Sequence, residues 1–135
     1  MTGRTFALCA AVVLLAAVRL PAAEIHDAVA AGDVERVRVL LAADPSLINA
    51  RDSAQNLPLH VAALQGRTAM IELLLAEGAD INIGDRENTS PLTIAAMRNH
   101  LDAVRLLAER GAQAAARDIN GETPLISAAR RGNLE

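Results

Sequence analysis

The 135-residue chain has a formal net charge of −3, and 52% of its residues are hydrophobic while 21% are charged, which excludes wholesale disorder. It contains one Phe and neither Trp nor Tyr, so Ala, Leu, Val and Ile must build the core. Such small side chains let helices approach closely, and they favour thin packed layers over a deep globular interior.

The first 23 residues differ from the rest and predict a signal peptide at 1–23. Arg4 precedes an uncharged apolar run at residues 6–18, and small residues close the segment, as in a cleaved export signal. The run is shorter than the roughly 20 residues that span a bilayer, so an uncleaved membrane anchor is a weaker alternative, as are a mistaken start codon and a buried helix. We expect cleavage near Ala23, with Ala17 and Ala22 as alternative sites. The predicted location is therefore secreted or periplasmic.

The mature chain would contain no thiol, because Cys9 is the only cysteine and lies in the apolar run. Disulfides, thiolate catalysis and cysteine metal sites are then not expected. Loss of Arg4 and Arg19 lowers the formal net charge from −3 to −5, since no acidic residue leaves with them. This acidic balance disfavours a nucleic-acid partner.

The sequence from residue 24 onward is periodic. The segment PLHVAALQG at 58–66 returns at the same interval as PLTIAAMRN at 91–99 and as PLISAARRG at 124–132. Two short helices cannot bury both apolar faces against each other alone, so such a unit needs a neighbour on each side. The period predicts an all-α fold, an α-solenoid of stacked helix–turn–helix repeats.

Each unit opens with a proline, which the first turn of a helix accepts because no N–H is needed there. Gly66, Asn99 and Gly132 are expected to end the first helix in a left-handed conformation. A second helix follows at once, and Gly78 and Gly111 mark its end. The predicted repeat domain spans 24–135, with repeats at about 24–51, 52–84 and 85–117 and a partial repeat at 118–135.

These segments resemble the ankyrin repeat, whose motif is Thr-Pro-Leu-His-x-Ala-Ala-x-x-Gly and whose unit has the same length as the period seen here. Matches to part of the motif occur in register at Thr123-Pro124-Leu125, Ser90-Pro91-Leu92 and Pro58-Leu59-His60-Val61-Ala62-Ala63. The resemblance covers the chain from about Glu24 onward. It implies a non-enzymatic module that binds another protein and needs no cofactor.

The repeats also depart from this motif. Residues 25–52 resemble a divergent first repeat in which Asp44 and Pro45 replace the glycine that ends the second helix. Leu57 replaces the motif threonine, so one helix start lacks a hydroxyl acceptor. Thr93 and Ile126 occupy the histidine position, and the imidazole bonds of the motif are therefore expected at His60 but not in the two later repeats.

The polar turns carry their own repeating pattern. Asp52, Asp85 and Asp118 begin successive turns, where a carboxylate can accept local N–H bonds. Gln55 and Asn88 occupy the position of a turn glycine, and we expect the Gln55 turn to be the more distorted, because Asn tolerates the left-handed conformation better.

No residue set predicts catalysis or metal binding. His26, His60 and His100 fall in different repeats, so they are not expected to converge on a metal. Ser127 lacks the glycine elbow of a hydrolase nucleophile, and the single Asp of each turn is too few for a calcium site. No phosphate-binding glycine loop is present in the sequence.

A protein-binding surface is predicted from the resemblance and from the positions that fail to repeat, which lie on the turn tips and the exposed side of the first helices. The tip positions are Ser53, Asn56, Arg86, Glu87, Thr89, Asn120 and Glu122. The helix positions are Leu64, Gln65, Met97, Arg98, Arg130 and Arg131. The alternative is that these are solvated residues free to vary. Met97 beside Arg98 favours a binding role, because apolar and guanidinium groups are enriched together at protein interfaces.

The identity of the partner does not follow from the sequence, and two other functions remain open. One is an accessory or inhibitory subunit that protects an exported enzyme. The other is an inactive remnant, since Asn133, Leu134 and Glu135 align with the first residues of a second helix and the chain is expected to be truncated there. The first helix of that last repeat would then lack its partner helix.

Overall fold

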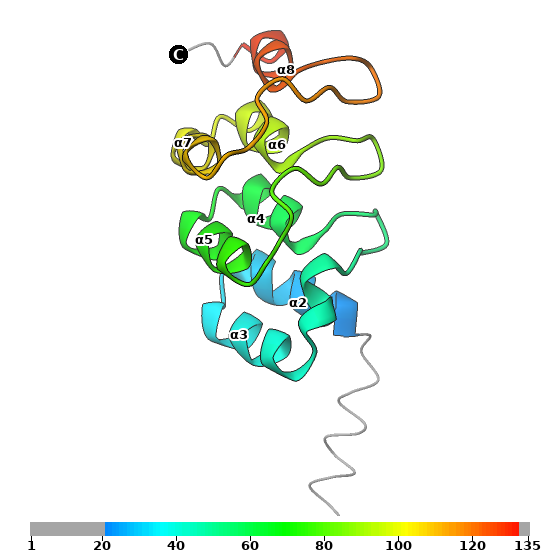
Figure 1. Cartoon of the computed structure of the whole chain (residues 1–135), viewed down its shortest axis with the longest axis vertical. Coiled ribbons are helices and arrows are strands. Elements are labelled where there is room, and N and C mark those ends of the chain that lie inside the picture. Colours follow the sequence, from blue (N-terminus) through cyan, green and yellow to red (C-terminus); the bar gives the residue numbers. More distant parts are fainter. Residues whose placement is uncertain (1–20, 133–135) are drawn as a thin grey trace, which may run out of the picture.

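The computed structural model describes residues 21–132, and their regular structure is entirely helical (Figure 1). Three helix pairs follow one another: α2 (Pro21–Ala31) with α3 (Val34–Ala43), α4 (Pro58–Gln65) with α5 (Thr68–Ala76), and α6 (Pro91–Met97) with α7 (Leu101–Glu109). A 3-10 helix, η1 (Pro45–Asn49), follows α3, and α8 (Pro124–Arg130) is the last helix described. The predicted all-α solenoid is confirmed.

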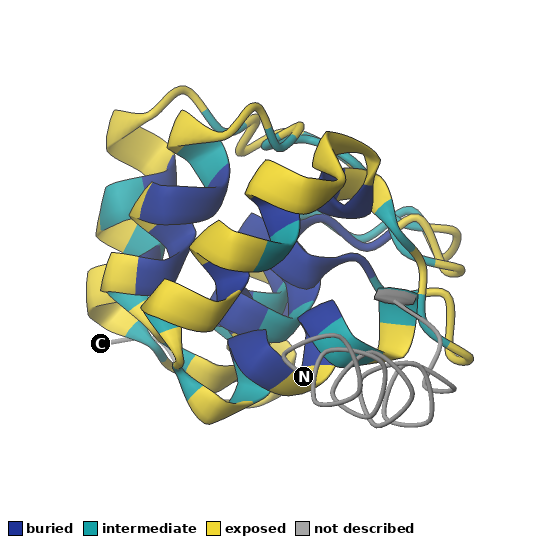
Figure 2. Cartoon of the chain, turned by 90° about the horizontal axis from the view of Figure 1, so that it is seen from below, coloured by how far each residue is buried: buried dark blue, intermediate teal, exposed yellow. Residues whose placement is uncertain are grey.

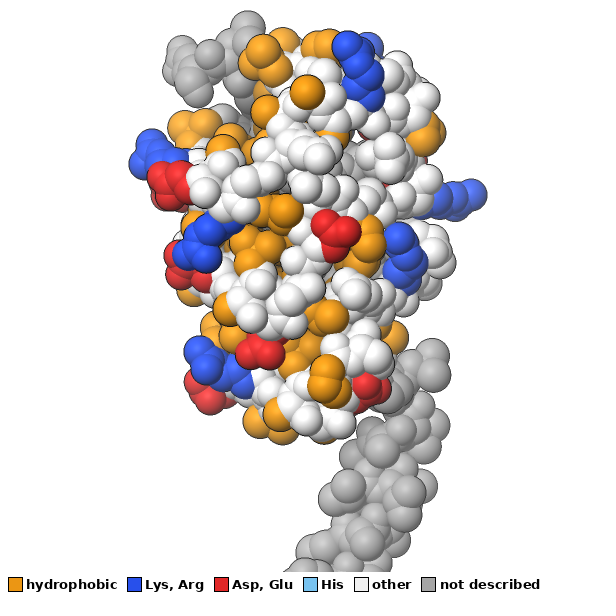
Figure 3. All heavy atoms as spheres, viewed as in Figure 1, with side chains coloured by type: hydrophobic (Ala, Val, Ile, Leu, Met, Phe, Trp, Pro, Cys, Tyr) orange, Lys and Arg blue, Asp and Glu red, His pale blue; other side chains and the backbone are white. Residues whose placement is uncertain are grey.

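The helices form two parallel rows. The helices α2, α4, α6 and α8 stack on one another in the first row, and α3, α5 and α7 stack in the second (Figure 1). The buried aliphatic core lies between the rows, and the outer faces of the helices and the turn tips are exposed (Figure 2). On the face presented in Figure 3, hydrophobic side chains show in the middle and charged ones mainly toward the edges. The thin aliphatic core expected from composition is therefore present.

The signals that begin and end the helices act as predicted. Proline occupies the first position of α4, α6 and α8. The left-handed residues that end these helices have positive φ angles, of 67° at Gly66, 59° at Asn99 and 80° at Gly132. The chain can turn there into the next helix because glycine, and to a lesser degree asparagine, tolerates this conformation.

The first repeat replaces its glycine turn with the 3-10 helix η1. The Asp44 carboxylate accepts a bond from the Ser46 N–H at 3.1 Å and another from the Ser46 hydroxyl at 2.6 Å. This cap starts η1, which buries Leu47 and Ile48 against the core. The replacement of the glycine by Asp44 and Pro45 is thus accommodated within a capped, packed turn.

Helix α2 begins within the segment that the sequence predicted to be a signal peptide. Helix α2 starts at Pro21, before the expected first residue Glu24, and the carbonyl of Ala22 is bonded to the His26 imidazole. The carboxylate of Glu24 pairs with Arg36 of α3. Most of the predicted signal peptide, residues 1–20, lies outside the described residues. Between residues 21 and 132, no helix has the length and apolar character required to cross a membrane.

Candidate functional site

The turns that project beside the first helices are each closed by one aspartate. The Oδ1 atom of Asp85 accepts the N–H of Glu87 at 2.8 Å and that of Thr89 at 2.9 Å. Asp52 and Asp118 make the same two bonds at 2.8 to 2.9 Å. The predicted local role of these carboxylates is confirmed, and the tips are therefore held in repeated, defined shapes.

The ionised form of Asp52 is favoured by this geometry. Burial would raise the pKa of Asp52, but bonds from the Asn56 backbone N–H, the Asn56 side-chain amide and the Ala54 N–H together hold that pKa below its ordinary value. A carboxylate that accepts several N–H bonds is stabilised in its charged state. The turn therefore retains a negative charge at its base at neutral pH.

The buried imidazole of His60 links one helix start to the next turn. Its Nδ1 accepts the N–H of Leu57 at 3.3 Å, and its Nε2 donates to the carbonyl of Thr89 at 3.0 Å. The expected imidazole bonds at His60 are confirmed. No side-chain cap bond is made at Leu57, whereas Ser90 caps its own helix by accepting the N–H of Thr93 at 3.2 Å.

Burial lowers the pKa of His60, although the bond to the Thr89 carbonyl opposes this shift. The neutral imidazole is the form that fits, because Nδ1 must accept a hydrogen bond while Nε2 donates one. His26 repeats part of this arrangement in the first repeat, where its Nε2 donates to the carbonyl of Asn56 at 2.9 Å. These two bonds tie successive turns to the helices beside them.

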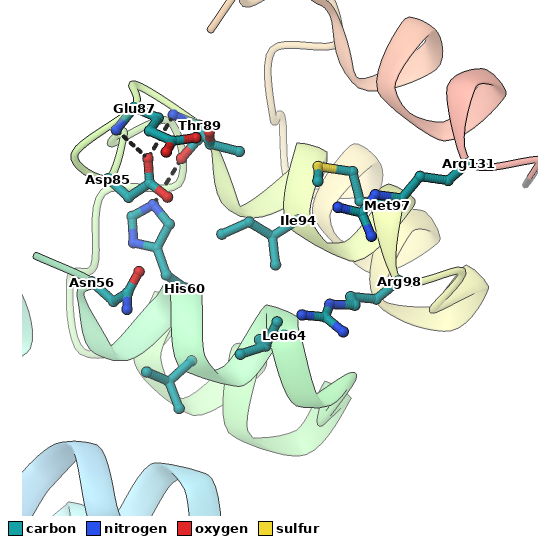
Figure 4. A pocket seen from close by; sticks show the side chains of 11 residues that line it. Asn56, His60, Leu64, Asp85, Glu87, Thr89, Ile94, Met97, Arg98 and Arg131 are labelled. Atoms are coloured by element: carbon teal, nitrogen blue, oxygen red, sulfur yellow. Dashed lines mark hydrogen bonds between the residues drawn. The ribbon is translucent and has the colours of Figure 1, made fainter. Parts of the chain in front are cut away.

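A groove lies between the turn tips and the first row of helices (Figure 4). Its first part is a cavity of about 200 Å³, and its second part, of about 170 Å³, lies one repeat further along. The first part is lined by Asn56, His60, Val61, Leu64, Asp85, Glu87, Thr89, Ile94, Met97, Arg98 and Arg131. The second is lined by Glu87, Thr89, Met97, Asp118, Asn120, Glu122, Ser127, Arg130 and Arg131. Since they share four residues, we treat them as one surface and call it the groove.

The two ends of the groove differ in chemistry. Asp85 and Glu87 lie at the end formed by the turn tips, and Ile94 occupies the middle (Figure 4). Arg98 and Arg131 lie at the opposite end, where α6 and α8 finish. The groove therefore joins an acidic end to a basic end across an apolar floor.

Most of the predicted binding residues line this groove. They are Asn56, Leu64, Glu87, Thr89, Met97, Arg98, Asn120, Glu122, Arg130 and Arg131. Ser53 and Arg86 are exposed on the tips but line neither part. Gln65 lies instead in a separate hollow beside Gly32 and Arg67. The structure thus brings together residues of both predicted groups, from tips and from helices.

Two of these residues are not the exposed tip positions that the sequence predicted. Thr89 is 7% exposed, and its carbonyl accepts the bond from His60. The side chain of Glu122 is 12% exposed and pairs with Arg130, and its Oε2 accepts the Ser127 hydroxyl at 3.2 Å. Thr89 and Glu122 therefore form part of the groove's floor and wall.

Several groove residues lie at positions that repeat regularly along the chain. Variation between repeats therefore did not identify them as binding residues. Val61, Ile94 and Ser127 occupy the same position in successive repeats and all line the groove, as do Asp85 and Asp118. Their regular spacing assigned them to the scaffold. A position can, however, serve both packing and contact, and Val61 and Ile94 are half-buried in the groove. Within the described part of the chain, no cluster of three or more potential metal ligands is found.

Comparison with known families agrees with this architecture. Two family models, each described as ankyrin repeats (many copies), match residues 40–95 and residues 92–135. No curated protein gives a significant match.

Proposed function

The chain belongs to the ankyrin repeat family, and we propose that it is exported from the cytosol and binds another protein through the groove. Ankyrin repeats are generally protein–protein interaction modules and are typically non-catalytic. The proposal of export rests on the charged start, the apolar run and the small residues of segment 1–23.

The observation that carries the binding role is the meeting of apolar and arginine side chains in one groove. Leu64 is 38% exposed at its edge, and Met97 lies beside Arg98 and Arg131 (Figure 4). Protein interfaces are enriched in such side chains, because they combine a large apolar area with directional hydrogen bonds. The rigid turns beside the groove limit the ordering that a partner must impose on binding.

The test is a crosslinking pull-down from the secreted or periplasmic fraction of the native cell. The chain with Met97→Ala and Arg98→Ala is compared with the wild type and with a control, Glu72→Ala with Arg105→Ala. The control residues are exposed on the second helices, away from the groove. Glu72 pairs with Arg110 at 3.7 Å, but an exposed pair of this kind contributes about 0–1 kcal/mol, so both variants should fold.

We expect the groove variant to lose the partner while the control keeps it. Leu107→Ala provides the stability reference, because this fully buried side chain leaves a cavity that costs roughly 2–5 kcal/mol. A partner lost from the control but retained by the groove variant would place binding on the second helices. Recovery of an exported enzyme as the partner, with altered activity or lifetime, would support the narrower accessory or inhibitory role.

A further inference from the structure

The charges of the groove are sorted to its two edges. The turn edge carries Asp85, Glu87 and Asp118, and the helix edge carries Arg98 and Arg131. Across residues 21–132, none of these five side chains forms an ion pair. Within these residues, their charges are therefore not neutralised by an oppositely charged side chain, although Asp85 and Asp118 also accept the N–H bonds of their turns.

The remaining charged pair in the groove is internally balanced. Arg130 pairs with Glu122, whose other carboxylate oxygen accepts the Ser127 hydroxyl. Arg98 and Arg131 consequently supply the positive charge of the helix edge. They hold the same position in successive repeats, directly before the left-handed residue that ends the first helix, where the preceding repeat has Gln65. The basic edge is thus a property of the last two repeats described.

An apolar floor separates the two edges. Val61 and Ile94 are half-buried there, and Leu64 is partly exposed near the helix end. Helix α6 has 7 residues and is about 10 Å long at ~1.5 Å per residue, which sets the scale of the separation. An extended peptide advances about 3.3 Å per residue, so roughly three to four residues cross the groove.

We propose that the groove recognises an extended segment of the partner protein in which an apolar side chain lies between a basic and an acidic residue. The basic residue faces Asp85 and Glu87, the apolar side chain lies on Ile94, and the acidic residue faces Arg98 and Arg131. Arginine can hold a carboxylate through two parallel hydrogen bonds, which gives this end geometric selectivity. This inference rests on the proposed function and specifies its partner.

The experiment is selection of a random peptide library displayed on phage against the full chain. Three targets are compared: the wild type, the groove variant Arg98→Glu with Arg131→Glu, and the control Arg38→Glu with Arg105→Glu. The control arginines are exposed on the second helices, and both variants change the net charge equally. Thermal melting is measured for all three, and Arg98→Gln with Arg131→Gln replaces the groove variant if reversal unfolds it.

The wild type and the control should enrich peptides with an apolar residue flanked by opposite charges a few residues apart. The groove variant should lose the preference for the acidic residue, and the glutamine variant should bind the selected peptides roughly tenfold more weakly, as expected for two lost exposed ion pairs. Binding should weaken with added salt. Peptides without this charge pattern, or equal enrichment on the wild type and groove variant, would overturn the inference.

Failure here is distinguishable from failure of the proposed function. If the native partner is lost from the Met97→Ala with Arg98→Ala variant but its contacting segment lacks the basic–apolar–acidic pattern, the groove is the binding site and the inferred specificity is wrong. If that variant retains the native partner while the peptides follow the pattern, the groove has the inferred chemistry and the proposed function is wrong.

Discussion

The imidazole of His100 occupies the space that a side chain on Gly66 would need. A Cβ atom at residue 66 would lie 2.6 Å from the His100 ring, and the ring Nε2 donates to the carbonyl of Leu64 at 2.9 Å. Arg67 fills the corresponding space at Gly32 one repeat earlier. Gly66 is therefore required by the next repeat as well as by its own backbone.

Gly66→Ala should lower the free energy of unfolding by roughly 2 kcal/mol, from left-handed strain of about 1 kcal/mol and a displaced His100 bond worth about 1 kcal/mol. Gly78→Ala is the matched control, because Gly78 has a φ of 96° but nothing within 4 Å of an added Cβ. The control should lose only the strain component of about 1 kcal/mol. Denaturant melts of both variants measure this difference, and equal losses would contradict the packing role of His100.

Stability should decrease as the pH falls below the ordinary histidine pKa of about 6.5, partly through His60. The pKa of folded His60 is lowered by burial, so the unfolded chain binds the proton first as the pH decreases. The loss of stability continues until the pH falls below the pKa that His60 has in the folded chain. Urea melts between neutral and mildly acidic pH test this, with His60→Gln as the comparison. A variant that keeps the full pH dependence of the wild type would exclude His60 as its source.

Gln55→Gly should stabilise the array by roughly 0.5–1 kcal/mol, because a glutamine is held at a φ of 68° in the turn. Asn88→Gly is the comparison at the equivalent position, where φ is 57°. Asparagine tolerates that conformation better, and its side-chain amide donates to the Arg117 carbonyl at 3.0 Å, so this variant should gain nothing. Thermal melts that rank the two variants in the opposite order would show that turn strain is not concentrated at Gln55.

Amide hydrogen exchange should be faster at residues 118–132 than at residues 58–110. Helix α8 packs mainly against α6, and its Leu125 is 71% exposed, whereas α4 and α6 have packed helices on several sides. Stability in repeat arrays is close to a sum of neighbour interfaces, so the least supported layer opens first. Mass spectrometry of exchanging peptides measures the profile. Uniform protection from residue 58 through residue 132 would contradict this account.

Export predicts a mature N-terminus between residue 18 and residue 24. A cut after Ala17 leaves the first turn of α2 intact, whereas a cut after Ala23 removes the Ala22 carbonyl that His26 contacts. N-terminal sequencing of protein from the secreted or periplasmic fraction locates the cut. Full-length protein recovered from the cytosol, still beginning at Met1, would refute export.

Much of the fold followed from the sequence because its signals are local. A proline at the first helical position and a glycine or asparagine at the helix end act within one turn of the chain, and α4, α6 and α8 begin and end accordingly. The regular repeat period then required stacking, because one helix pair cannot bury its own apolar surface. The aspartate-closed turns were predictable for the same reason, since their bonds reach two and four residues along the chain.

The groove was decided by the tertiary structure. Thr89 is buried where its own turn contacts His60 of the preceding repeat. Gly66 is constrained by His100, which lies in the following repeat. The separation of Arg98 and Arg131 from the acidic turn edge likewise depends on how the turns fold back over the first helices (Figure 4). Sequence position shows which residues recur, but contact between repeats depends on the orientation of each backbone relative to its neighbour.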